Sequence, residues 1–304
     1  MEKQLTPGTI ETEKLLADLN GLWTTLAGEQ QGALLRACSM TLVVTCEGDG
    51  DAARVRRMIG VVMREHPSRA ILIELKNGAL PEGRVFSECH RGAGGSEQIC
   101  SEGIEIATDP EHLAGIARQI APLAARDLPV MLWCRGPRVF SSAVFEPLYP
   151  IAQRIIVDSC TAQDLATALA AVKKIRAGGR RVADLAWTRL TGWREALAYR
   201  LEANSIRAEQ IRTAAVRYSG AAAEPCARYL KFWIEGAAPS ARVSVEKIAG
   251  ETGIRAIAVS CARMELNVDL SKPREAERDE AELIHEELSI SGADPVFEDL
   301  LNRL

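Results

Sequence analysis

Aromatic residues are scarce in this chain: five tryptophans, four tyrosines and five phenylalanines make up 5% of its 304 residues. Long apolar runs are also missing, since no segment reaches the ~18 uninterrupted apolar residues of a membrane-spanning helix. The polar, acidic N-terminus lacks the apolar core of a secretory signal. We therefore expect a cytoplasmic protein with no membrane partner.

Positive charge is not in excess, because 37 lysines and arginines are set against 41 acidic residues and the formal net charge is -4. A nucleic-acid-binding domain normally has a basic face on which Lys and Arg alternate with aromatic residues. The sequence contains no run of that kind, so nucleic acid is not an expected partner.

The short motifs of common catalytic and metal sites are absent as well. No CxxC pair indicates a structural zinc, and the four histidines occur without HExxH spacing. A GxSxG elbow and a Walker loop are both missing, which leaves a hydrolase or a kinase without support. We therefore expect no catalytic residues, no metal and no cofactor. The eight cysteines are typical of reduced thiols, most of them in the core.

Short β-branched runs alternate with longer helical stretches along the chain, a pattern typical of an α/β fold. The order strand, helix and three strands occurs over residues 38–107 and returns over 211–270. We predict two α/β domains with mixed sheets, and we interpret the recurring order as a duplicated unit, although residue identity barely recurs.

The predicted domain boundary is "RAGGRR" (176–181), which is short, basic and glycine-containing. A helical segment is expected over 1–35 and an α/β domain over 36–180. The second α/β domain, over 181–304, should end in helices.

The turn "CEGDGDAA" follows a predicted strand and precedes a predicted helix that has Asp51 as its N-cap. Gly48, Gly50 and Ala53 fit the GxGxxA fingerprint of a dinucleotide site, and Glu74 ends the next strand as a ribose-binding acid would. One interpretation is therefore a nucleotide-binding or NAD(P)-dependent enzyme that uses Gly48–Ala53.

The same turn carries three carboxylates, on Glu47, Asp49 and Asp51. They stand where a pyrophosphate would bind, and negative charge at a helix N-terminus opposes the binding of an anion. We favour the alternative, a solvated turn that binds no cofactor.

Cys89 and Cys100 lie at equal distances from the midpoint between Gly94 and Gly95. A regular hairpin would put them directly opposite each other, where a reversible disulfide is geometrically possible. The alternative is a pair of ordinary thiols on a sheet, which a cytoplasmic setting favours. Both interpretations stay open, and the pair is a candidate redox site.

Two of the tryptophans lie six positions apart in "DLAWTRLTGWREALAYRLE" (184–202), each with an arginine nearby. Their helical spacing places them on a stripe with leucines, which is typical of a buried face. Trp and Arg are also enriched at interface hot spots. The candidate partner-binding residues, at or just behind a docking surface, are therefore Trp187, Arg189, Trp193 and Arg194; the alternative is that both indoles fill the junction between domains. Thr191 is the predicted N-cap of a helix that begins after a break.

Several blocks occur together in the order found in the glucose-6-phosphate dehydrogenase assembly proteins, the OpcA family, which the chain resembles. They are "RACSMTLVV", "HPSRAILIE", "DLPVMLWCRG", "RIIVDSC", "DLAWTRLTGWREALA", "EAELIHEEL" and "DPVFEDLL". The resemblance implies a non-catalytic assembly factor and allosteric activator that binds the glucose-6-phosphate dehydrogenase oligomer and controls the oxidative pentose phosphate pathway. Some photosynthetic relatives are linked to thioredoxin, so the resemblance adds thioredoxin as a second candidate partner.

Overall fold

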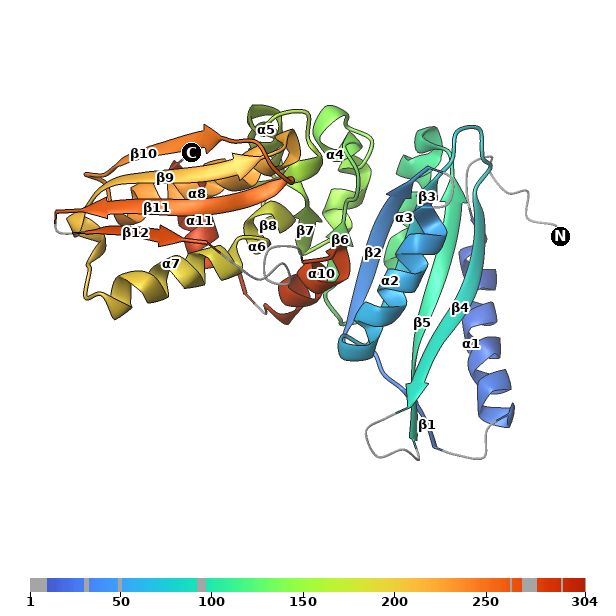
Figure 1. Ribbon diagram of the computed structural model, residues 1–304. Helices are drawn as coiled ribbons and strands as arrows, with labels where there is room; N and C mark the ends of the chain where they lie inside the picture. Colours follow the sequence, from blue (N-terminus) through green and yellow to red (C-terminus); the bar gives the residue numbers. More distant parts are fainter. Residues whose placement is uncertain are drawn as a thin grey trace. The chain divides into compact units, whose positions relative to one another are not determined.

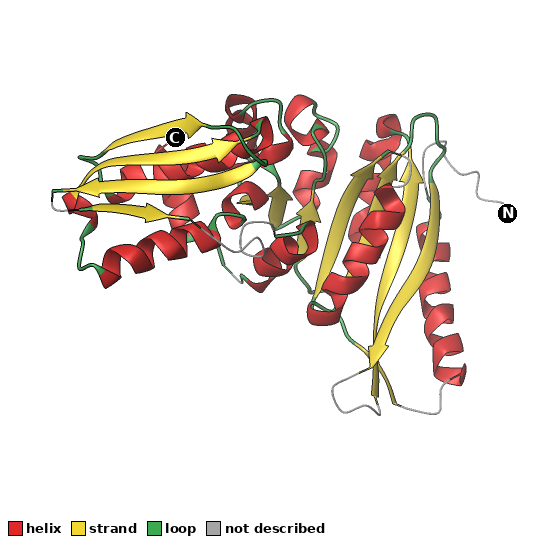
Figure 2. Cartoon of the chain, viewed as in Figure 1, coloured by secondary structure: helices red, strands yellow, loops and turns green. Residues whose placement is uncertain are grey.

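The chain divides into two compact units, which are described separately below (Figure 1). The computed structural model describes residues 10–29, 33–48, 51–91, 97–262, 264–269, 278–290 and 292–303. The first unit comprises residues 1–157 and 174–182, and the second comprises 158–173 and 183–304. Strands and helices alternate in both units (Figure 2), so the prediction of an α/β fold with two mixed sheets is confirmed.

The first unit is built on the larger sheet, which has eight strands. Its strands are β1 (Ala33–Arg36), β2 (Met40–Glu47), β3 (Ser68–Leu75), β4 (Glu82–Arg91), β5 (Glu97–Thr108), β6 (Val130–Trp133), β7 (Arg154–Val157) and β8 (Arg181–Asp184). They follow the order β1-β5-β3-β2-β6-β7-β8, with β4 paired to β5 off this path. The β4–β5 pair is antiparallel, whereas the pairs from β1 to β7 along the path are parallel.

Helices cover both faces of this sheet. Leu15 of α1 (Thr12–Glu29) lies against Gly83, where an added Cβ would come within 2.7 Å of the leucine side chain. On the other face, the guanidinium of Arg56 in α2 (Asp51–Glu65) lies 4.5 Å from the ring centroid of Phe86. Since positions 83 and 86 point to opposite sides of β4, α1 and α2 lie on opposite faces. A parallel sheet covered in this way has apolar central strands, and seven of the eight residues of β2 are buried.

Shorter elements complete the chain between β5 and β8. They are α3 (Leu113–Leu123), α4 (Arg138–Ser141), α5 (Leu165–Ala177) and the 3-10 helices η1 (Pro110–His112), η2 (Glu146–Ile151) and η3 (Ser159–Thr161). Asp158 accepts a hydrogen bond from the amide of Cys160 and so caps η3. This short helix belongs to the second unit.

The second unit is built on a four-stranded sheet in the order β10-β9-β11-β12. Its elements are α6 (Leu185–Thr188), α7 (Thr191–Ala203), η4 (Ala208–Gln210), β9 (Ile211–Ser219), η5 (Ala221–Ala223), α8 (Glu224–Ala237), β10 (Arg242–Lys247), β11 (Gly253–Cys261), β12 (Glu265–Val268), α10 (Glu280–Ser289) and α11 (Pro295–Arg303). β9 and β10 are parallel, and β11 is antiparallel to both of its neighbours.

The pairing of the strands corrects the expected duplication. Both segments have the predicted element order, from β2 to β5 and from β9 to β12. In the first segment, however, the third strand pairs only with the fourth, whereas in the second the third strand also pairs with the first. The strand orders β2-β3-β5-β4 and β10-β9-β11-β12 therefore differ, and the two segments are not copies of one sheet.

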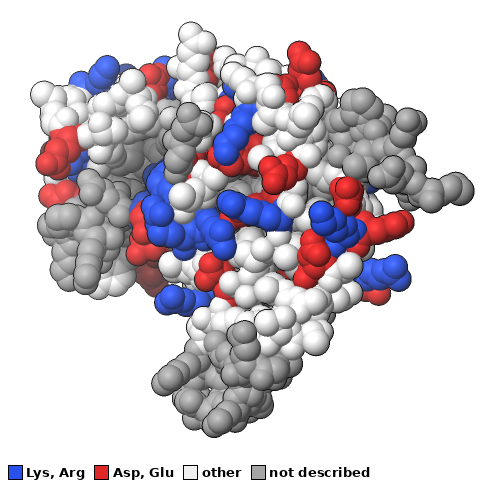
Figure 3. All heavy atoms as spheres, turned by 90° about the vertical axis from the view of Figure 1, so that its right-hand side faces the viewer, with Lys and Arg blue, Asp and Glu red and all other residues white. Residues whose placement is uncertain are grey.

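The predicted limits 1–35, 36–180 and 181–304 stay a prediction. Within the described residues, no helix has both the length and the apolar character required to cross a bilayer. On the face of the molecule seen in Figure 3, basic and acidic side chains are interspersed among uncharged ones.

Candidate functional site

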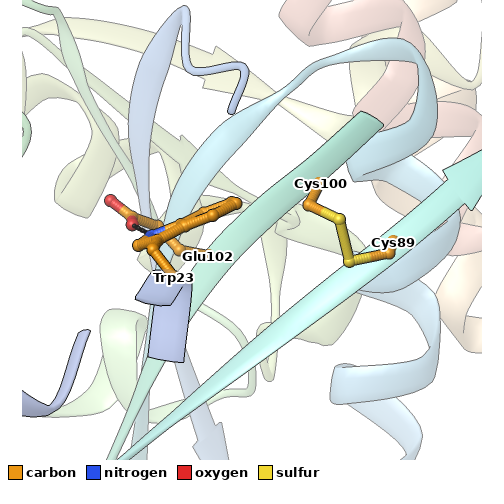
Figure 4. Close-up of a disulfide and its surroundings, with 4 residues drawn as sticks. All are labelled: Trp23, Cys89, Cys100 and Glu102. Carbon is orange, nitrogen blue, oxygen red and sulfur yellow. Dashed lines mark hydrogen bonds between the residues drawn. A yellow bond between two sulfur atoms is a disulfide. The ribbon is translucent and has the colours of Figure 1, made fainter. Parts of the chain in front are cut away.

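The two cysteines of the predicted hairpin occupy directly opposite positions on β4 and β5. Their sulfurs form a disulfide, with an S–S distance of 2.00 Å and Cα atoms 4.1 Å apart (Figure 4). Cys100 is completely buried, whereas Cys89 is partly exposed. The structure thus places Cys89 and Cys100 as the hairpin symmetry predicts; a reversible redox role for the pair stays a prediction.

A buried ion pair lies two residues along β5 from the disulfide. The indole nitrogen of Trp23 in α1 donates to Glu102 Oε2 at 2.6 Å, and Arg69 Nε donates to Glu102 Oε1 at 2.6 Å. The side chains of Arg69 and Glu102 are only 12% and 3% exposed. Residues 100 and 102 point to the same face of the strand, so the disulfide shares its face with the contact that holds α1 (Figure 4).

The turn between β2 and α2 contains an internal ion pair. Arg135, just beyond the end of β6, places Nη1 2.6 Å from Asp51 Oδ2, and its side chain is 7% exposed. Asp51 also accepts from Arg54 at 3.1 Å. Burial by itself would raise the pKa of Asp51, but the hydrogen bonds and positive charge of Arg135 and Arg54 outweigh it and lower the pKa.

Asp51 differs from its predicted role as an N-cap, because α2 already includes it as the first residue. Its carboxylate pairs with the buried guanidinium of Arg135, which needs a counter-ion. Beside it, Arg138 pairs with Glu47 at 2.9 Å.

Three of the remaining residues of the dinucleotide fingerprint lie in the described structure: Gly48, Ala53 and Glu74. Glu74 pairs with Lys76 at 2.8 Å, and Ala53 is an exposed residue of α2. Gly48 has a φ of +89°, which suits a tight turn. Asp49 and Gly50 lie outside the described residues. The helix N-terminus that a pyrophosphate would use is next to the chain's own Asp51–Arg135 pair, which favours the solvated turn.

Trp187 lies in the core of the second unit and is 2% exposed. Its ring stacks on Phe297 of α11, with centroids 5.5 Å apart and planes at 24°. It also meets Tyr229 of α8 edge-on at 6.4 Å. The indole nitrogen donates to Asp294 Oδ2 at 2.7 Å. The ring thus joins α6, α8 and α11, and its polar atom is satisfied.

The guanidinium of Arg194 lies 3.7 Å from the centroid of the Trp187 ring, which is a cation–π contact. Burial lowers the pKa of Arg194 to about 10, so the side chain stays charged at neutral pH. Its side chain is 15% exposed, and its nearest carboxylate, on Asp294, is 3.9 Å away. Arg194 therefore stabilises the core of the second unit through its contact with Trp187.

The helical break predicted in this stretch is present between α6 and α7, at Arg189 and Leu190. The predicted cap is different, because Leu190 and not Thr191 is the N-cap residue of α7. Thr191 belongs to the first turn, and its hydroxyl donates to the carbonyl of Thr188 at 3.0 Å and lies 2.6 Å from Glu286 Oε1. The neighbouring carboxylate of α10 thus engages a hydroxyl that the isolated sequence suggests for a cap.

Arg189 forms a two-pronged ion pair with Asp158, with N–O distances of 2.7 and 3.0 Å. Burial alone would lower the pKa of Arg189, but the hydrogen bonds and charge of Asp158 raise it, so the group is permanently charged. The Arg189 side chain is 27% exposed, more than that of Arg194. Of the two candidate arginines, it is the one better able to reach a partner.

A pocket of about 310 Å³ lies beside this ion pair within the second unit. Its wall includes Trp193, which is 3% exposed, together with Arg189, Thr252 and Arg278. Cys160 and Cys226 also line it, and their sulfurs are 3.3 Å apart. No sequence signal relates these two cysteines, because they are 66 residues apart on different elements.

The structure therefore separates the predicted partner-binding residues into two groups. Trp187 and Arg194 pack against each other in the core, and Arg189 and Trp193 meet at the pocket. Neither indole has an exposed face, so each can affect docking only through the residues that it supports. Among the described residues, no cluster of three or more His, Cys, Asp or Glu side chains is arranged to hold a metal ion.

Two family models match the chain. Residues 60–174 match the glucose-6-phosphate dehydrogenase subunit N-terminal domain, and residues 180–301 match the corresponding C-terminal domain. A curated relative, a candidate OxPP cycle protein OpcA from Nostoc punctiforme, is 31% identical over 103 residues. That alignment covers 34% of this chain and 22% of the relative, so the chain spans only about a fifth of the relative's length.

Solved structures that align with much of the chain include oxidoreductases of low sequence identity. A WlbA dehydrogenase from Thermus thermophilus aligns over 86% of this chain and 91% of its own, with 11% identity and a TM-score of 0.47. Biliverdin reductase from Synechocystis aligns over 88% of this chain and 95% of its own, with 8% identity and a TM-score of 0.43.

Proposed function

The chain belongs to the glucose-6-phosphate dehydrogenase assembly (OpcA) family, and we propose on that ground that it is a non-catalytic partner of the glucose-6-phosphate dehydrogenase oligomer. In this role it binds the enzyme in the cytoplasm, promotes its assembly or active state and acts as an allosteric activator. It thereby controls entry into the oxidative pentose phosphate pathway.

The observation that carries this proposal is the pair of family matches, which together extend from residue 60 to residue 301. A non-catalytic role is also supported by the turn after β2. There Asp51 is engaged by Arg135, and Glu47 by Arg138, next to the helix N-terminus that a dinucleotide would need.

We propose that the docking surface lies over Arg189 and Trp193, with Trp187 and Arg194 just behind it. Arg189 supplies a charged group that is partly exposed and held in one orientation by Asp158. A preorganised arginine loses little side-chain entropy on binding and orients an acidic partner surface. The two buried indoles then support this surface by fixing α6 and α7.

For the hairpin we propose that the Cys89–Cys100 disulfide is reversible and that thioredoxin reduces it. Support comes from the exposure of Cys89, which gives an attacking thiolate access to one of the two sulfurs. Glu102 of β5 also holds α1 through Trp23, so reduction of the disulfide would change the packing on that face of the first unit.

The direct test is co-elution of the purified protein with its cognate glucose-6-phosphate dehydrogenase from a size-exclusion column. A common peak at higher mass than either protein alone is the expected result. Separate elution at micromolar concentrations of both proteins would contradict the proposal.

A further inference from the structure

Two free thiols meet in the second unit. Cys160 lies on η3 and Cys226 in the first turn of α8, and their sulfurs are 3.3 Å apart. A disulfide requires an S–S distance of about 2.05 Å, so the sulfurs need to approach by little more than an ångström. This pair is distinct from Cys89 and Cys100, which belong to the first unit.

A buried carboxylate fixes the two elements that carry these thiols. Asp184, which has no exposed surface, accepts from the amide of Ser159 at 3.0 Å and from the hydroxyl of Tyr229 at 2.8 Å, and the Ser159 hydroxyl donates to it as well. Ser159 precedes Cys160, and Tyr229 is one helical turn after Cys226. The network therefore holds both cysteines at a defined separation.

Both thiols line the pocket of about 310 Å³. Cys160 is partly exposed, whereas Cys226 is only 5% exposed. The contact with Cys226 and burial raise the pKa of the Cys160 thiol, and Arg189, whose Nη1 lies 3.4 Å from the Cys160 sulfur, opposes that rise. Cys160 is thus the sulfur that an incoming reagent reaches first.

We propose that Cys160 and Cys226 form a reversible disulfide by exchange with a low-molecular-weight disulfide that enters this pocket. The Cys160 thiolate attacks one sulfur of the reagent, which breaks the reagent's S–S bond and releases one thiolate. The Cys226 thiolate then attacks the Cys160 sulfur and displaces the second thiolate. The protein loses two electrons and two protons, and the reagent leaves as two thiols.

The product would link η3 covalently to α8 beside the Asp158–Arg189 ion pair. The Cys160 sulfur lies 3.4 Å from Arg189 Nη1, so oxidation replaces the thiol in contact with the guanidinium by a disulfide sulfur. Oxidation would thereby alter the surroundings of Arg189 while leaving the sheet of the second unit in place.

The test uses the full chain with glutathione disulfide as the probe, in buffers of increasing oxidised-to-reduced ratio. Thiols that remain are blocked with an alkylating agent, and non-reduced peptides are examined by mass spectrometry. We expect a peptide that joins residues 160 and 226, a loss of two alkylated thiols per chain, and full reversal by reduced glutathione.

Matched variants separate this pathway from incidental oxidation. In Cys226→Ser, the reaction should stop at a mixed disulfide between Cys160 and glutathione, because the thiol that attacks in the second step is absent. In Cys160→Ser, Cys226 should stay unmodified, while Cys261→Ser, which removes a partly exposed free thiol of β11, should still form the 160–226 link. Alkylation of both thiols at every ratio, or equal mixed-disulfide yields in the wild type and Cys226→Ser, would overturn the proposal.

Discussion

Arg194 lies with its guanidinium carbon 3.7 Å from the ring centroid of Trp187, so the cation and the indole form one buried contact. The indole nitrogen of Trp187 and the guanidinium of Arg194 both approach the carboxylate of Asp294. This Trp–Arg–Asp contact joins α6, α7 and the N-terminus of α11. It explains in structural terms why the chain concentrates tryptophan and arginine in one short stretch.

Replacement of Trp187 by alanine should destabilise the protein by ~3–5 kcal/mol, because it leaves a large cavity beside Phe297 and Tyr229. Urea denaturation followed by circular dichroism measures this free energy. The matched control is Tyr199→Ala on α7, whose side chain is 69% exposed and whose loss should cost less than about 0.5 kcal/mol. Equal effects of the two changes would show that Trp187 does not support the core.

A docking role for Arg189 predicts different results for the two halves of its ion pair. Arg189→Gln removes the charge that a partner would contact, and affinity for the dehydrogenase should fall about tenfold, or ~1.4 kcal/mol. Asp158→Asn keeps the arginine and its charge but removes the group that orients it, so affinity should fall clearly less than in Arg189→Gln. Titration calorimetry measures both, with the melting temperature as a check on folding. A similar loss in both variants would assign the pair a structural role alone.

The ion pair between Asp51 and Arg135 should make the free energy of unfolding depend on pH. The pKa of Asp51 is lowered in the folded state, so its ionised form stabilises the fold above the unfolded pKa of about 4, and this contribution is lost as the pH falls through the folded pKa. Asp51→Asn should therefore cost ~1–3 kcal/mol near pH 7, with the difference from the wild type narrowing below pH ~4.

Urea unfolding at several pH values between 3 and 7 tests this expectation. The control is Asp299→Asn, which removes a 66% exposed carboxylate paired with Arg303 and should change stability little at any pH. A constant difference between the wild type and Asp51→Asn over this range would mean that the ion pair with Arg135 is not the source of the effect.

Redox control through the hairpin predicts that Cys89→Ser abolishes any effect of dithiol reductants on activation of the dehydrogenase. The reason is that Cys89 and Cys100 are bonded to each other, so either serine leaves no disulfide to reduce in a chain whose Cys160 and Cys226 are free thiols. Activation is compared before and after treatment with reduced thioredoxin. Cys38→Ser, which removes a free thiol of the same unit, is the control and should respond as the wild type does. An unchanged response in Cys89→Ser would remove the hairpin from regulation.

The sequence allowed accurate prediction of features that are local. The order strand, helix and three strands predicted over residues 38–107 is present as β2, α2, β3, β4 and β5, because each strand is a short run of strand-forming residues bounded by turn residues. The positions of Cys89 and Cys100 followed from the symmetry of a single hairpin.

Features that depend on distant residues were not predictable. Asp51 meets Arg135 across 84 positions, and Cys160 meets Cys226 across 66. The sheet order was missed for the same reason, since the pairing of β11 with β9 depends on tertiary packing and not on the order of elements along the chain. Spacing and periodicity describe one element or one turn at a time, and they do not indicate which elements become neighbours.

The central claim, that this chain is an activating partner of glucose-6-phosphate dehydrogenase, is tested most directly by the rate of the purified enzyme at subsaturating glucose 6-phosphate as the protein is added. We predict that the rate of NADP reduction rises and saturates at a fixed ratio of the two chains, while the protein alone reduces no NADP. An unchanged rate at a several-fold excess of folded protein, or NADP reduction by the protein alone, would contradict the account.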